Sequence, residues 1–120
     1  MAIAINHVNI RTKDLERSIR FYTEALGLTQ GFRPDFGFRG AWLYDGEKAA
    51  VHLNETSEDA ANLDNAMDHV AFAVDRLDDA LSRLDRLGVR YSGLRAIPGS
   101  PIRQCFLKDP NGVTIELQGP

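Results

Sequence analysis

Apolar and polar residues alternate in two short segments of the chain that share one arrangement. INHVNIR, at positions 5–11, and MDHVAFAV, at positions 67–74, each carry a histidine as the third residue. Alternation with a period of two is typical of β-strands that turn one face to a core. We therefore expect two strands in which His7 and His69 occupy equivalent positions.

A helical pattern follows each predicted strand. Asp14 and Asp75 stand where an N-cap is expected, and Gly27 and Gly88 stand where a left-handed C-cap would end a helix. Between these caps, apolar residues recur at every third or fourth position, which predicts two amphipathic helices. Their apolar stripes are Leu15, Ile19, Tyr22 and Leu26, and Leu77, Leu81, Leu84 and Leu87.

Two further segments, AWLYDGEKAAVHL (41–53) and CFLKDPNGVTIEL (105–117), align residue for residue without a gap. Both place turn residues, DG in one and DPNG in the other, between runs rich in aromatic and β-branched residues. This pattern predicts two β-hairpins. In this alignment His52 falls on Glu116.

The repeated order of features predicts an α+β fold in a single domain, residues 1–120. Each half is expected to form a βαβββ module, module one over 1–53 and module two over 67–120, and the two modules are expected to form a curved mixed sheet shaped as a cup. The segment 54–66 is polar and lacks an apolar stripe, so it is the predicted linker.

Composition narrows the class of protein. The chain has 120 residues, 43% hydrophobic and 26% charged, which is typical of a folded globular domain. Its net charge of −3 argues against a nucleic-acid partner. Cys105 is the only cysteine, so no intrachain disulfide can form and a cytoplasmic location is expected. The N-terminal segment resembles neither a signal peptide nor a membrane span, so no membrane partner is expected.

Four residues with metal-binding side chains stand at two pairs of repeat-equivalent positions, His7 with His69 and His52 with Glu116. Approximate symmetry between the modules would bring them to one centre. Imidazole nitrogens and a carboxylate suit divalent Zn, Ni, Co, Mn or Fe, and the absence of thiolate ligands favours an open catalytic site. A single strand histidine is more often a hydrogen-bonded core residue, and His52 is the weakest member: His7, His69 and Glu116 could complete the site with water.

These residues and spacings resemble the vicinal oxygen chelate superfamily, which includes glyoxalases, methylmalonyl-CoA epimerases, extradiol dioxygenases and bleomycin-binding proteins. HVNIRTKDLERSIRFYTEALGL resembles the opening strand and helix of that family, and FLKDPNGVTIEL resembles its closing hairpin with the last carboxylate ligand. The resemblance implies a metal-dependent lyase or isomerase of glyoxalase type that acts on a small carbonyl substrate through an enediolate. Glu116 would then be both ligand and catalytic base.

Two alternatives stay open. One is an extradiol Fe(II) dioxygenase, although Phe106 stands where that group carries a tyrosine. The other is a metal-free binding protein of the bleomycin-resistance type, against which the histidines and Glu116 argue.

The resemblance also indicates substrate contacts and an assembly. Arg11 resembles the arginine that holds the glutathione carboxylate in glyoxalases, although a solvated surface arginine is an equal alternative. Phe36 and Phe38, in the segment RPDFGFRG, are candidates for the wall of a substrate pocket. A homodimer is expected, because C2 pairing would cover the open sheet edges, and each site could be shared between the two chains.

Overall fold

The computed structural model describes residues 2–57, 66–108 and 113–120. By compactness the chain divides into two units, His7–Asp68 and Met1–Asn6 with His69–Pro120. The first residues of the chain thus group with its second half. The predicted boundaries of modules and linker stay a prediction, because most of the linker lies outside the described residues and residues 54–55 still belong to a strand.

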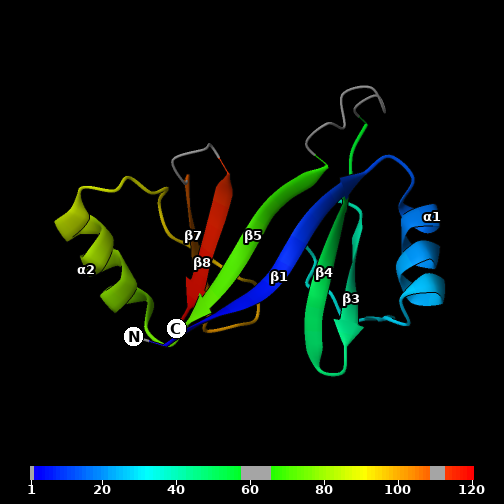
Figure 1. Ribbon diagram of the computed structural model, residues 1–120, viewed down its shortest axis with the longest axis horizontal. Helices are drawn as coiled ribbons and strands as arrows, with labels where there is room; N and C mark the ends of the chain where they lie inside the picture. The colour runs from blue at the N-terminus through cyan, green and yellow to red at the C-terminus, as the bar shows by residue number, and fades with distance from the viewer. Residues whose placement is uncertain (1, 58–65, 109–112) are drawn as a thin grey trace. The chain divides into compact units, whose positions relative to one another are not determined.

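The first repeat folds in the order strand, helix and three strands. Its four strands follow the spatial order β2-β3-β4-β1, with β1 parallel to β4 and the other pairs antiparallel. Figure 1 labels three of them, β3, β4 and β1. Its elements are β1 (Ile3–Thr12), α1 (Leu15–Arg20), the π-helix η1 (Phe21–Ala25), β2 (Thr29–Gly31), β3 (Gly40–Asp45) and β4 (Lys48–Glu55).

The second repeat has the same order of elements. Its strands lie in the order β5-β8-β7-β6, and β5 is parallel to β8. Its elements are β5 (Met67–Val74), α2 (Leu77–Leu87), β6 (Arg95–Ala96), β7 (Arg103–Lys108) and β8 (Thr114–Gly119). The predicted α+β class with two βαβββ modules is confirmed.

Strand pairing confirms the repeat at the level of single residues. In the first repeat, β1 and β4 place Asn9 opposite His52. In the second, β5 and β8 place Ala71 opposite Glu116. Asn9 and Ala71 each stand two residues after the histidine of their strand, so the two parallel pairs have the same register.

The two hairpins also have matching registers at the positions of His52 and Glu116. Trp42 pairs with His52 across β3 and β4, and Phe106 pairs with Glu116 across β7 and β8. Between Leu43 and the turn of the first hairpin, a β-bulge shifts the pairing register of β3 and β4. Gly46 in that turn has φ +63°, a conformation that favours glycine, as the predicted turn requires. The predicted DPNG turn lies outside the described residues.

The helix ends agree with the sequence at three of four positions. Asp14 caps α1 through a hydrogen bond that the Arg17 N–H donates to its side chain, 3.1 Å. Gly27 and Gly88 have φ of +76° and +70°, as left-handed C-caps do. The prediction that Asp75 caps the second helix is wrong.

Arg76 is the N-cap of α2, and the Asp75 side chain accepts a hydrogen bond from the N–H of Arg76. The first helix also changes from α to π geometry after Arg20, which the apolar spacing does not reveal. No helix among the described residues is long and apolar enough to cross a membrane.

Each repeat has its own hydrophobic core, formed by its helix and one face of its strands. In the first repeat the core centres on the fully buried Leu43 and Leu53, with Leu15 from α1 packed beside them. In the second it centres on Leu77 from α2 and Cys105 from β7, both with 0% exposure. The opposite strand faces are thereby left to polar and aromatic side chains, as alternation predicts.

Candidate metal centre

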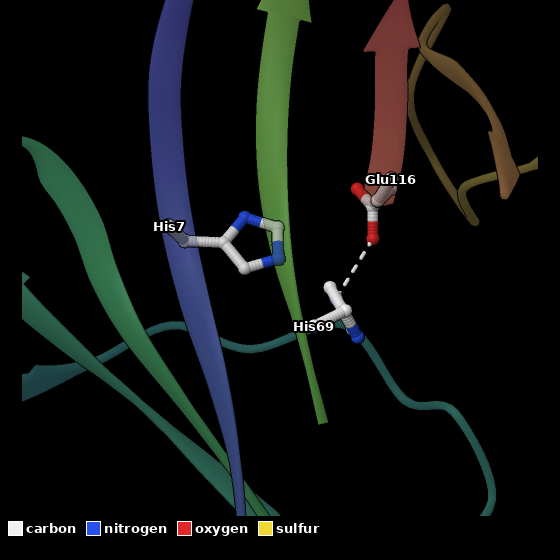
Figure 2. Close-up of side chains that lie close together, drawn as sticks. All are labelled: His7, His69 and Glu116. Carbon is white, nitrogen blue, oxygen red and sulfur yellow. Dashed lines mark ion pairs between the residues drawn. The ribbon is translucent and has the colours of Figure 1, made fainter. Parts of the chain in front are cut away.

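A buried histidine and carboxylate face each other in the second repeat. The parallel pairing of β5 and β8 brings His69 Nε2 within 3.1 Å of Glu116 Oε1. Both residues are buried, with exposures of 7% and 2%. Figure 2 shows this ion pair as a dashed line, together with the His7 side chain that β1 carries. A carboxylate that is taken out of water needs such a partner.

Two neighbours confine this pair. The ring of Phe106 meets the His69 ring edge to face, with centroids 5.5 Å apart. On the carboxylate, Gln118 Nε2 donates a hydrogen bond of 2.9 Å to Glu116 Oε2. The same nitrogen also donates to Asn6 Oδ1 at 3.1 Å. The two oxygens of Glu116 thus have different partners.

In the first repeat the corresponding residues form a stack of three rings. His7 and His52 are parallel, with centroids 3.6 Å apart, and Trp42 stacks on the other face of His52 at 4.0 Å. His52 Nε2 lies 3.1 Å from the carbonyl oxygen of Ala49. Because a carbonyl only accepts, this nitrogen must carry the proton, and Nδ1 is the nitrogen that His52 can offer to a metal.

The predicted pocket phenylalanines lie together beside this stack. Phe36 and Phe38 are stacked at 6.0 Å, and Phe36 also approaches Trp42 at 6.1 Å. Arg33 lies over both phenyl rings and donates to the Phe38 carbonyl oxygen at 3.1 Å. Burial lowers the pKa of Arg33 from its ordinary value. Their role in binding substrate stays a prediction.

Arg11 is held by a residue that the sequence did not suggest. Its Nε lies 3.9 Å from the Asp68 carboxylate, and its backbone N–H donates to Ala66. The guanidinium is about a quarter exposed. Any substrate carboxylate would therefore have to share Arg11 with Asp68, and its substrate role stays a prediction.

A hollow of about 330 Å³ lies in the second repeat, lined by residues 89–92 and 106–108. Phe106 is shared between this hollow and the edge contact with His69. Cys105, next in β7, points instead into the core, where burial and then the charge of Glu116 raise the pKa of its thiol. A buried thiol of this kind is not an activated nucleophile.

The donor set suits a divalent ion of borderline softness. His7, His69 and Glu116 are all buried, and each offers one ligand atom, a ring nitrogen or a carboxylate oxygen. Mixed nitrogen and oxygen ligands fit Zn, Ni, Co, Mn or Fe(II), whereas Mg and Ca prefer oxygen alone. These three residues are among the ligand candidates predicted from the sequence. Gln118 is not among the predicted site residues, although its polar side chain, two positions after Glu116 on the same strand face, was a usable signal.

Comparison with known proteins gives a consistent result. The family model described as the Glyoxalase/Bleomycin resistance protein/Dioxygenase superfamily matches residues 4–117. A lactoylglutathione lyase of Salmonella typhimurium is 31% identical, over 92% of this chain and 88% of its own length. A protein named glyoxylase I 4 from Arabidopsis thaliana is 28% identical, over 95% of this chain and 69% of its own length.

Among solved structures, methylmalonyl-CoA epimerase from Mycobacterium tuberculosis has 30% sequence identity and a TM-score of 0.73. The match covers 97% of this chain and 87% of that one. These relatives are enzymes, a lyase and an epimerase. The family match spans both repeats and all four candidate ligands. The chain therefore belongs to the glyoxalase, bleomycin resistance protein and dioxygenase superfamily.

Proposed function

We propose that this protein is a metal-dependent lyase or isomerase that moves a proton next to the carbonyl group of a small substrate. The observation that carries the proposal is the buried His69–Glu116 pair, 3.1 Å apart on the strand face opposite the core. A histidine and a carboxylate in this position can bind a metal, and the carboxylate can exchange a proton.

His7, His69 and Glu116 are the proposed ligands, and His52 is a fourth candidate through Nδ1. A divalent ion held there would polarise the oxygens of the substrate and make the neighbouring C–H more acidic. His7 belongs to the other compact unit, so it would come either from the same chain or from a partner chain.

Glu116 is the proposed base. Its carboxylate would take the proton from the carbon next to the carbonyl and return it, either to the neighbouring carbon or to the opposite face of the same carbon. The first outcome is isomerisation and the second is epimerisation, and neither needs an oxidant or a second substrate.

The relatives support this reaction class. One is named a lactoylglutathione lyase and another a methylmalonyl-CoA epimerase. We propose that the substrate of this chain is likewise a small carbonyl compound, carried as a thiol adduct or as a thioester. Phe36 and Phe38 are the proposed apolar contacts, and Arg11 is proposed to hold a carboxylate of the substrate.

The test is proton exchange in deuterated water. Metal-loaded protein is incubated with a panel of 2-oxoaldehyde thiol adducts and acyl-CoA esters, and deuterium at the carbon next to the carbonyl is followed by mass spectrometry. The proposal expects exchange or turnover with at least one class, lost in Glu116→Gln and retained in Glu47→Gln, an exposed carboxylate in the first hairpin turn. The absence of both exchange and turnover in every class would contradict the reaction.

We also propose a homodimer whose two sites are shared between chains. Inactive His7→Ala and Glu116→Ala proteins are mixed after dissociation and reassociated. With shared sites, a mixed dimer contains one intact site and recovers part of the activity or metal binding. With sites inside one chain, every site stays damaged and nothing returns.

A further inference from the structure

We infer that Gln118 is a positioning residue that assigns different tasks to the two oxygens of Glu116. This inference rests on the proposed function, in which Glu116 is both ligand and base. Gln118 follows Glu116 by two positions on β8, so both side chains leave the same face of the strand.

The hydrogen bonds determine how the Gln118 amide is oriented. A carboxylate oxygen only accepts, so the Gln118 nitrogen must be the group that faces Glu116 Oε2 at 2.9 Å. Asn6 Oδ1 lies 3.1 Å from the same nitrogen and accepts its second hydrogen. Both hydrogens of the amide are therefore used, and the nitrogen is fixed between two acceptors.

This arrangement separates the oxygens of Glu116. Oε1 faces His69 Nε2 at 3.1 Å and is the oxygen on the ligand side. Oε2 accepts the hydrogen bond of Gln118 and is the oxygen that would take the substrate proton. Gln118 thereby restricts rotation of the carboxylate and would hold Oε2 in place for proton transfer.

The equivalent position in the first repeat differs. There Asn54, on β4, donates to Asn9 Oδ1 at 3.1 Å. Asn54 is thus a matched control: the same kind of side-chain amide, at the same place in the repeat, bonded to a residue outside the proposed ligands.

The first measurement needs no metal. In metal-free, nitrogen-15-labelled protein, the side-chain amide protons of Gln118 should be shifted and slow to exchange, and Glu116→Ala should move them. Signals of Gln118 that Glu116→Ala leaves unchanged would overturn the inference. This measurement does not depend on whether the protein catalyses the proposed reaction.

The second measurement uses Co²⁺ as the probe, by calorimetry and by its visible absorption spectrum. Gln118→Leu should weaken Co²⁺ binding by about 10–100-fold, the usual effect of removing a partner that orients a ligand. It should also change the spectrum, because the carboxylate is released. Gln118→Glu, which keeps the volume but cannot donate a hydrogen bond when ionised, should also change the spectrum, because Oε2 loses its partner. Asn54→Leu should alter the affinity by less than about threefold.

Wild-type affinity and spectrum in both Gln118 variants would overturn the inference. The two proposals fail separately. If the wild-type protein binds Co²⁺ but exchanges no substrate proton, the proposed reaction is contradicted. The Co²⁺ affinities and spectra of the Gln118 variants still decide whether Gln118 positions Glu116. A wild-type protein that binds no Co²⁺ contradicts the metal site, and the amide signals then decide the inference.

Discussion

Two repeat-equivalent leucines, Leu15 and Leu77, should contribute almost equally to stability. Each is the first residue of its helix, and they are 5% and 0% exposed, whereas Leu26 and Leu87 at the far ends of the two helical stripes are 59% and 70% exposed. If the repeat governs packing, the first pair anchors the two cores and the second pair does not.

The magnitudes follow from burial. Replacing a fully buried leucine by alanine costs about 3 kcal/mol, which combines lost transfer free energy with the cavity left behind. For Leu26 and Leu87, the buried fraction of a side chain worth about 2 kcal/mol gives costs of about 0.8 and about 0.6 kcal/mol. For a chain of 120 residues, about 3 kcal/mol lowers the Tm by about 12 °C.

The assay is urea unfolding followed by far-UV circular dichroism, with the free energy of unfolding obtained by linear extrapolation. Leu15→Ala and Leu77→Ala should agree within about 1 kcal/mol. A cost of Leu87→Ala equal to that of Leu77→Ala, or a nearly neutral Leu15→Ala, would contradict equivalent packing of the two helix starts.

Three further predictions concern single residues. Asp14→Ala should lower the free energy of unfolding by about 1 kcal/mol, because it removes the cap of α1, and Asp75→Ala should lower it less, which urea unfolding can compare. Gly119→Ala should cost about 1–3 kcal/mol in the same assay, because an added Cβ would lie 2.5 Å from the Val74 carbonyl oxygen; an unchanged midpoint would contradict that close contact. Burial raises the pKa of the Cys105 thiol, so the folded state keeps this proton where the unfolded state has lost it. Stability should therefore fall as the pH rises above about 8.5, and less steeply in Cys105→Ala; equal slopes would argue against the raised pKa.

The order of elements in the two repeats is predictable because each element has its own short-range periodicity, whereas the metal-binding role of the ligand candidates stays a prediction. Strand alternation places His69 and Glu116 on the face opposite the core, and the gapless alignment predicts that His52 and Glu116 hold equivalent positions, which strand pairing confirms. Asp75 was predicted wrongly because a cap depends on backbone angles. The chain turns into α2 one residue later, at Arg76.

Contacts between distant residues were beyond sequence reasoning. Asp68 approaches Arg11 although 57 positions separate them in the chain. The hydrogen bond from Gln118 to Asn6 joins residues near opposite ends of the chain. Such pairs depend on how strands align in space, which no local pattern of residues determines.

The proposed metal centre is tested by the metal content of the purified protein, measured by elemental analysis after loading with Zn, Ni, Co, Mn or Fe(II). We expect about one tightly held divalent ion per chain. His7→Ala, His69→Ala and Glu116→Ala should each lose most of it while keeping a folded far-UV spectrum. A wild-type protein that retains no ion, or substituted proteins that retain as much as the wild type, would contradict the proposed metal centre.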